Sequence, residues 1–248
     1  MDWSEFLVNH KGLVIAPAGH GKTHAIAECL KQCGDGRQLV LTHTHAGIAA
    51  IQKKLKKMQV ASTCYHIETI AGFAQSLVLA FLGSGKIPSR EEDSYFPTVT
   101  LEACRLLAVE SLRTVLRISY KSLFVDEYQD CSDNQHKLIM QLAEIMPTHI
   151  FGDEMQGIFA FDGATRDFNK DLVDFKIYDE LKTPWRWKVN GNCEALGQWI
   201  LNTRHLLEQP RSTIRLTSDA EAHVKVVVRP FDQTKYYFDV GKEIITVR

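Results

Sequence analysis

The sequence predicts an α/β fold in which helices flank a parallel β-sheet. Short apolar runs alternate along the chain with segments of helical periodicity, and the apolar runs end in loops that carry glycine or acidic residues. In sheets of this kind the carboxyl ends of the strands meet at one edge, where ligands bind. We therefore expect the functional residues to lie in the loops that follow the strands.

The strongest local pattern lies near the N-terminus. Apolar residues 13–15 lead into the loop APAGHGKT, and apolar residues then recur at helical spacing, which predicts a strand, a loop and a helix. Gly19 and Gly21 have no Cβ, so the backbone can turn tightly and point N–H groups inward. On this pattern Lys22 reaches nucleotide phosphates and the Thr23 hydroxyl ligates Mg²⁺. Alanine replaces the first glycine of the strict pattern, so a chance match stays open on this stretch alone.

The remaining strands and helices follow from the same periodicities. Strands are expected at residues 39–43, 60–67, 122–125 and 148–151, and further along at 223–228 and 243–247. Helices are expected at residues 46–58, 69–82, 101–116, 132–145 and 189–207. Residues 83–97 combine Gly, Ser, Pro and charges, which is typical of a surface loop or a small insertion. The inner side of the helix at 101–116 is expected to consist of Leu106, Leu107, Val109, Leu112 and Val115.

The composition is that of an ordinary globular protein, which we expect to be cytoplasmic and to have no membrane partner. The chain of 248 residues is 45% hydrophobic with a formal net charge of −1, so no overall basic field indicates nucleic acid. No stretch approaches the roughly eighteen apolar residues that span a bilayer, and the N-terminus lacks the features of a signal peptide. The six cysteines form no CxxC pair. The best local basic patch consists of Lys53, Lys54, Lys56 and Lys57.

A nucleotide site needs a second, acidic element, because a metal held by one hydroxyl and phosphates is under-coordinated and the attacking water needs a base. Residues 123–125 are an apolar strand that ends in Asp126 and Glu127. We expect Asp126 to hold the Mg²⁺ shell and Glu127 to point at the water. The alternative is that the two acids cap the helix that follows.

Six stretches of the sequence resemble, in the same order, motifs of the UvrD/Rep/PcrA DNA helicases of superfamily 1. DEYQD at 126–130 resembles motif II, and APAGHGKT at 16–23 is similar to the Walker A motif of these helicases. The other matches are motif Ia at 41–51, motif Ib at 69–74, motif III at 150–164 and motif IV at 181–187. The resemblance implies a RecA-like P-loop ATPase domain that uses ATP and Mg²⁺ and acts on single-stranded DNA.

The resemblance also implies roles for individual residues. It assigns catalysis to Lys22, Glu127, Gln156 as the sensor of the γ-phosphate, and Arg186 as an arginine finger. The residues that it implies at the nucleotide are Ala18, Gly19, His20, Gly21, Lys22, Thr23, His24 and Trp185. Thr23 and Asp126 are implied as the metal ligands, and Asp153 as the link between the ATP and DNA sites. The residues that it implies at DNA are Thr42, His43, Thr69 and Phe161.

The sequence departs from these helicases at several positions. The upstream glutamine that reads adenine has no counterpart, since the first glutamine of the chain is Gln32. In motif Ia, His43 replaces an aromatic residue that stacks on DNA and Ala46 replaces a lysine. In motif III, Asp162 stands where an arginine is expected. These departures weaken the predicted DNA path more than the predicted ATP site.

The motifs predict two parts of the chain. Residues 1–185 are expected to form RecA-like domain 1A, with a short helical insertion similar to domain 1B at about 83–118, and residues 186–248 a linker and the beginning of a second RecA-like domain. Motifs V and VI are missing, so either the chain is a fragment or another chain completes the site. For residues 1–248 alone we expect weak ATP hydrolysis.

Two functions are consistent with the sequence. The first is an ATP-dependent helicase or translocase on single-stranded DNA, in DNA repair or in an anti-phage system such as Gabija, whose helicase-like component the chain resembles. The second is an ATP- and DNA-sensing regulatory subunit that controls a partner nuclease without unwinding DNA. His43, Ala46 and Asp162 favour the second function. Glu127, Gln156 and Arg186 favour catalysis.

Overall fold

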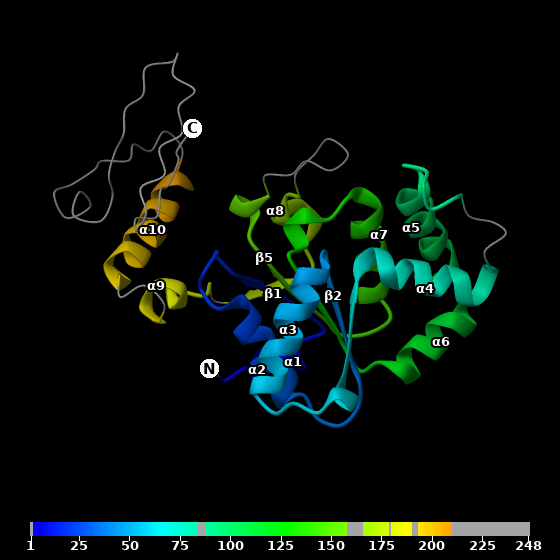
Figure 1. Cartoon of the computed structure of the whole chain (residues 1–248), viewed down its shortest axis with the longest axis horizontal. Coiled ribbons are helices and arrows are strands. Elements are labelled where there is room, and N and C mark those ends of the chain that lie inside the picture. The colour runs from blue at the N-terminus through cyan, green and yellow to red at the C-terminus, as the bar shows by residue number, and fades with distance from the viewer. Residues whose placement is uncertain (1, 84–87, 158–165, 179, 190–192, 210–248) are drawn as a thin grey trace, which may run out of the picture. The chain divides into compact units, whose positions relative to one another are not determined.

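The computed structural model describes residues 2–83, 88–157, 166–178, 180–189 and 193–209. The chain divides into two compact units, Met1–Leu181 and Lys182–Arg248 (Figure 1). Each unit is described by itself. The predicted strands at 223–228 and 243–247, and the part of motif III from residue 158 onward with Phe161, lie outside the described residues.

One parallel sheet forms the centre of the first unit. In the part of the chain that the structure describes, it has six strands in the order β3-β2-β4-β5-β1-β6. The strands are β1 (Lys11–Ile15), β2 (Gln38–Thr42), β3 (Tyr65–Thr69), β4 (Leu123–Asp126), β5 (Thr148–Gly152) and β6 (Lys176–Tyr178). Every pairing between neighbouring strands is parallel, which confirms the predicted fold class.

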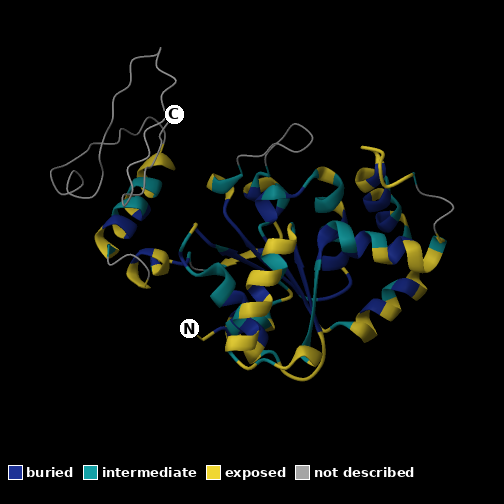
Figure 2. Ribbon diagram, viewed as in Figure 1, coloured by how far each residue is buried: buried dark blue, intermediate teal, exposed yellow. Residues whose placement is uncertain are grey.

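Helices cover both faces of the sheet (Figure 1). One face packs against α1 (Ser4–Val8), α2 (Lys22–Gln32) and α3 (His45–Lys57), and the other against α4 (Ile70–Leu82), α5 (Tyr95–Leu106), α6 (Glu110–Ser119), α7 (Asp133–Ala143) and α8 (Phe168–Asp171). Successive strand residues point to opposite faces, so Leu13 joins one apolar cluster and Val14 the other. Both clusters exclude water, and the central strands are buried (Figure 2). This explains why these strands read as continuous apolar runs.

Two expectations about secondary structure are wrong. The helix expected at 101–116 is two helices, α5 and α6, and α5 already begins at Tyr95, inside the expected loop, because Pro97 is tolerated in the first turn of a helix. The break re-phases the helix, so Val109 and Val115 are 48% and 49% exposed instead of facing inward. The strand expected at 60–67 begins only at Tyr65, after the short 3₁₀ turn η1 (Ser62–Cys64). The apolar residues before that turn pack on the core without pairing in the sheet.

The second unit contains α9 (Trp185–Val189) and α10 (Glu194–Leu207). The two helices pack closely at Gly197, where a Cβ would lie 2.5 Å from Cβ of Pro184. The Trp187 ring is buried beside them. No helix in the described ranges is long and apolar enough to cross a membrane.

A candidate nucleotide-binding site at the carboxyl edge of the sheet

The loop between β1 and α2 has the backbone that an anion-binding loop requires. Gly19 and Gly21 have φ angles of +76° and +93°, a region that residues with a Cβ rarely adopt. Gly21 is the N-cap of α2, and its lack of a side chain leaves the first-turn N–H groups without a side-chain cap. Exposed N–H groups and the positive end of a helix dipole suit a phosphate group.

Other residues of the loop fix its shape. Nδ1 of the buried His20 lies 2.9 Å from the carbonyl oxygen of Ala18. The loop is also tied to β5, because the Ala16 N–H donates to the Gly152 carbonyl at 2.9 Å. Thr23 and His24 lie in the first turn of α2, and Nε2 of His24 is 3.4 Å from Oε1 of Glu28. The predicted nucleotide-contacting residues 18–24 therefore form one continuous structure, and their binding role stays a prediction.

The two acidic residues at the end of β4 lie against Lys22. Nζ of Lys22 is 3.5 Å from Oδ1 of Asp126 and in direct contact with Oε2 of Glu127. The three side chains meet because β5 alone separates β1 from β4 in the sheet. The structure thus brings Lys22 together with Asp126 and Glu127, which follow it by more than a hundred residues in the sequence.

Asp126 is a buried carboxylate whose environment fits a cation. Burial raises its pKa to about 6, while the Lys22 ammonium acts in the opposite direction. Its Oδ1 atom accepts no hydrogen bond from the described residues. Those residues hold no group of three or more His, Cys, Asp or Glu that could bind a metal alone. A metal here would rely on Asp126, Thr23 and ligand phosphates, which is how proteins usually hold Mg²⁺.

Glu127 has an unusual backbone conformation. Its φ of +55° and ψ of +44° lie in the left-handed region, which costs a non-glycine residue free energy. Its Oε2 atom accepts a hydrogen bond from Nε2 of Gln129 at 2.7 Å in addition to the contact with Lys22. The acidic pair does not cap α7, because Ser132 caps that helix in a reciprocal box with Gln135. The left-handed backbone of Glu127 therefore belongs to the carboxyl edge of the sheet and not to the N-terminal cap of α7.

Gln156 connects the end of β5 to the β1 loop. It lies in η4 (Glu154–Gln156), and its Nε2 atom donates to Oδ2 of Asp153 at 2.6 Å and to the Ala16 carbonyl at 3.3 Å. Asp153 is 1% exposed, so the hydrogen-bond partner of Gln156 in the loop after β5 is held in a fixed position. The predicted sensor of the γ-phosphate is therefore within reach of the loop that would hold the phosphates.

Sequence reasoning missed Gln129. This residue lies in η3 (Tyr128–Asp130) and is 3% exposed, and its side chain contacts both Glu127 and the backbone of Asp153. In the sequence, only its position within DEYQD indicated a role for this residue, and that position does not show which groups its side chain contacts. A glutamine that bridges two strand ends is identified only when both ends are placed in space.

Three of the residues predicted to contact DNA, Thr42, His43 and Thr69, lie at the ends of β2 and β3, and their side chains contact other parts of the protein. Thr42 is 1% exposed under Gly47, where a Cβ would lie 2.6 Å from Oγ1 of Thr42. The Thr69 hydroxyl accepts from the Gly72 N–H at 2.9 Å and caps α4. Phe161 lies outside the described residues. The predicted DNA contacts of Thr42, Thr69 and Phe161 stay predictions.

His43 points toward the acidic strand end. Its Nε2 atom is 3.4 Å from Sγ of Cys131, in the loop that follows β4. Burial lowers its pKa to about 4, so the ring is neutral near pH 7. A neutral ring can contact DNA by stacking or hydrogen bonding, and it cannot attract a phosphate by charge.

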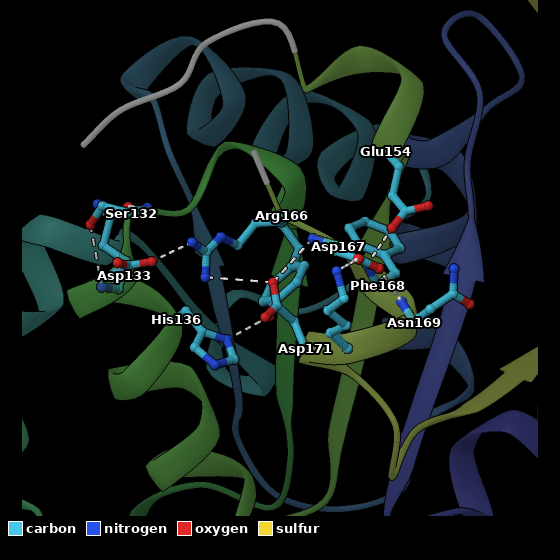
Figure 3. A network of polar contacts seen from close by, with 12 residues as sticks. Ser132, Asp133, His136, Glu154, Arg166, Asp167, Phe168, Asn169 and Asp171 are labelled. Atoms are coloured by element: carbon cyan, nitrogen blue, oxygen red, sulfur yellow. Dashed lines mark hydrogen bonds and ion pairs between the residues drawn. The ribbon is translucent and has the colours of Figure 1, made fainter. Parts of the chain in front are cut away.

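Arg166 directly follows residues 158–165 in the sequence and contacts two acidic side chains (Figure 3). Its buried guanidinium contacts Oδ1 of Asp133 in α7 and lies 3.5 Å from Oδ2 of Asp171 in α8. The Glu154 carboxylate in turn accepts a hydrogen bond from the Phe168 N–H. These contacts fix both flanks of residues 158–165, the segment that carries the predicted DNA-stacking residue.

We expect Arg166→Met to lower the free energy of unfolding by about 1–3 kcal/mol, because it removes a buried charge that two carboxylates share. The loss should be smaller than for a fully buried pair, since the Asp133 side chain is 63% exposed. Urea unfolding measures the change. Lys170→Ala removes an exposed pair with Asp167 and should leave the midpoint unchanged. Equal effects of the two substitutions would contradict this role of Arg166.

Trp185 and Arg186 belong to the second unit. Trp185 is 44% exposed, and the Arg186 guanidinium lies 5.8 Å from the centre of the Trp187 ring. Both residues are thus available at the surface of their own unit. Their predicted contacts with the nucleotide stay predictions.

The fold and the arrangement of Lys22, Asp126 and Glu127 define the class of α/β domains that carry a phosphate-binding loop beside an acidic strand end. A family described as AAA domain matches residues 4–162, which is more than half of the chain, and the chain belongs to this family.

Similar proteins include two from Buchnera aphidicola. The chain is 28% identical over 144 residues to the RecBCD enzyme subunit RecB of subspecies Schizaphis graminum, covering 54% of this chain and 12% of that protein. It is 31% identical over 119 residues to the ATP-dependent DNA helicase Rep of subspecies Acyrthosiphon pisum, covering 46% of this chain and 17% of that protein. The chain therefore spans less than a fifth of either relative. The match to Rep confirms the resemblance to UvrD/Rep/PcrA helicases.

Similar solved structures are also helicases. The arterivirus nonstructural protein 10 helicase has a TM-score of 0.42 at 15% identity, covering 71% of this chain and 36% of that chain. A Pif1 helicase from Bacteroides, in complex with ADP-AlF3 and single-stranded DNA, has a TM-score of 0.36 at 12% identity, covering 71% and 39%.

Proposed function

We propose that this chain binds and hydrolyses ATP with Mg²⁺ as the motor domain of a helicase or translocase on single-stranded DNA. The observation that carries the proposal is the convergence of Lys22, Asp126, Glu127 and Gln156 on one loop at the carboxyl edge of the sheet. Membership of the AAA domain family and similarity to Rep support it.

Each residue has a role in this proposal. The β1 loop and Lys22 bind the phosphates, and Thr23 and Asp126 hold Mg²⁺, which neutralises phosphate charge when bound. Glu127 accepts a proton from water as the water oxygen bonds to the γ-phosphorus and the bond to the bridging β–γ oxygen breaks, which leaves ADP and phosphate. Gln156 responds to the γ-phosphate, and the resemblance to the helicase motifs assigns nucleotide contacts to Trp185 and Arg186.

The contact between Lys22 and Glu127 gives this site an order of events. While the ammonium lies against the carboxylate, Lys22 occupies the Glu127 oxygen that would accept a proton from water. Phosphates compete for Lys22, so nucleotide binding releases Glu127 to act on water. In this order of events, Glu127 acts on water only after the phosphates have replaced it at Lys22.

Phosphate release from ATP tests the proposal. The assay measures turnover with Mg²⁺, with and without a single-stranded oligonucleotide, and with GTP in place of ATP to test selectivity for adenine. Binding of ATP with Mg²⁺ and measurable phosphate release would support the proposal. Absence of nucleotide binding in a titration would refute it.

DNA binding should prefer single strands and weaken steeply as salt is added, because phosphate contacts release counterions. If a base stacks on Phe161, Phe161→Ala should cost about 1–3 kcal/mol of binding free energy. Fluorescence anisotropy of a labelled oligonucleotide at several salt concentrations measures both effects. The control is Phe81→Ala, which removes an exposed ring at the far end of α4. Equal affinities for the wild type and the Phe161 variant would place the DNA path elsewhere.

The second candidate function is a regulatory subunit that binds ATP and DNA and controls a partner nuclease. The contact between His43 and Cys131 favours it, because the ring at the DNA-stacking position of motif Ia is turned toward the protein. ATP binding that DNA does not convert into turnover would support regulation. DNA-stimulated turnover would support the motor.

A further inference from the structure

The side chain of Gln129 is buried beside the acidic pair and is hydrogen-bonded at both ends of its amide. The side chain is 3% exposed, and both ends of its amide are bonded. Nε2 donates to Oε2 of Glu127 at 2.7 Å, and Oε1 accepts from the Asp153 N–H at 3.0 Å. A buried amide with both ends satisfied is rigid, so it transmits its position to its partners.

The backbone determines the orientation of this amide. A backbone N–H can only donate, so the atom of Gln129 that faces Asp153 must be the carbonyl oxygen. The NH₂ group therefore faces Glu127 and donates a hydrogen bond to Oε2 of that carboxylate.

Gln129 also completes a closed series of polar contacts. From Asp153 the series continues to Gln156 and the Ala16 carbonyl at the start of the phosphate-binding loop. On the other side it continues from Glu127 to Lys22 at the end of the same loop. The glutamine is the member that joins the end of β4 to the end of β5.

Two glycines lie close to this side chain. A Cβ on Gly152 would lie 3.2 Å from Oε1 of Gln129, and a Cβ on Gly157 would lie 3.6 Å from Cβ of Gln129. Gly157 immediately precedes residues 158–165, which carry the predicted DNA-stacking residue.

We propose that Gln129 is a positioning residue for hydrolysis, which holds the Glu127 carboxylate in place and couples it to Asp153, directly after the end of β5. This inference rests on the proposed function, in which Glu127 is the base. Gln129 acts on the reaction through Glu127 and through Asp153.

Two substitutions separate its two contacts. Gln129→Glu keeps the acceptor for the Asp153 N–H and places a carboxylate against Glu127, whereas Gln129→Met removes both hydrogen bonds at similar volume. We expect single-turnover hydrolysis of bound ATP by the 248-residue chain to fall about 10- to 100-fold in both variants. The Kd of ATP should stay within about threefold, because the phosphate-binding loop is untouched. A rate within twofold of the wild type in both variants, or parallel loss of rate and ATP binding, would overturn the proposal.

A thermal unfolding cycle tests the contact without relying on hydrolysis. Gln129→Glu should lower the melting temperature, because two carboxylates face each other, and adding Glu127→Gln should restore it, because donor and acceptor are then exchanged. Strictly additive shifts would overturn the direct contact. A wild-type rate in Glu127→Gln alone would refute the proposed function, and the cycle would still report on Gln129.

Gln38 is the matched control. It has the same 3% exposure, and its amide is also bonded, to the Ser122 hydroxyl at 2.5 Å and the Gly36 carbonyl at 3.4 Å, at the opposite end of β2. Gln38→Met should lower the melting temperature and leave the hydrolysis rate of the folded protein unchanged. Equal slowing by Gln38→Met and Gln129→Met would overturn the positioning role, because loss of any buried amide would then suffice.

Discussion

Lys22→Ala is expected to remove nearly all ATP binding, with the Kd rising by about 10²-fold or more, or roughly 3 kcal/mol. The substitution deletes the cation that would meet the triphosphate. It also leaves Asp126 and Glu127 without the positive charge that now lies against both. Two uncompensated carboxylates would repel the incoming phosphates, so the loss exceeds that of one contact.

Isothermal titration with ATP and Mg²⁺ measures this effect. Lys31→Ala is a matched control, because Lys31 is an exposed lysine in the last turn of the same helix. Its Kd should equal that of the wild type. If Lys22→Ala bound ATP as the wild type does, the assignment of the phosphate-binding loop would be wrong.

Glu127→Gln is expected to lower the rate of hydrolysis about 10²- to 10⁴-fold, because the amide keeps the shape of the side chain and cannot accept the proton. ATP binding should survive and become tighter. The reason is the contact between Lys22 and Glu127 in the free protein, since phosphates no longer compete with a carboxylate for the ammonium.

Single-turnover hydrolysis and a binding titration on the same preparation separate the two effects. Glu144→Gln is the control, because that carboxylate is 62% exposed at the end of α7 and pairs only loosely with Arg113 at 3.7 Å. A parallel fall of binding and hydrolysis in Glu127→Gln would mean that Glu127 holds the loop in shape and does not act on water.

Local chemistry was sufficient to predict most of the elements that carry the site. The positive φ angles at Gly19 and Gly21 are ones that glycine supplies, so the loop could be placed from residue types alone. The apolar strand before Asp126 and the helix after Ser132 were also predicted, since a buried strand and a capped helix have local patterns. The break between α5 and α6 was not predicted, because neither glycine nor proline marks it.

The site residues that sequence reasoning missed or placed differently have partners far away in the chain. His43 contacts Cys131, which is 88 residues away, and this contact changes how its ring is interpreted. Gln129 contacts the backbone of Asp153, 24 residues away. Every residue except proline has a backbone N–H, so residue types do not show which distant N–H a side chain will contact. Glu127 lies in the left-handed region with a side chain that does not favour it, and only the surrounding packing holds it there.

The sequence by itself determined that a glycine-containing loop follows one strand and an acidic pair follows another, because strand, turn and helix preferences act over a few residues. The tertiary structure alone decided that β5 lies between these strands. Strand order depends on how the crossover helices pack on the two faces, which no local pattern encodes. That order brings Gln129, Asp153 and Gln156 between Glu127 and the phosphate-binding loop, and it joins separate motifs into one hydrogen-bonded site.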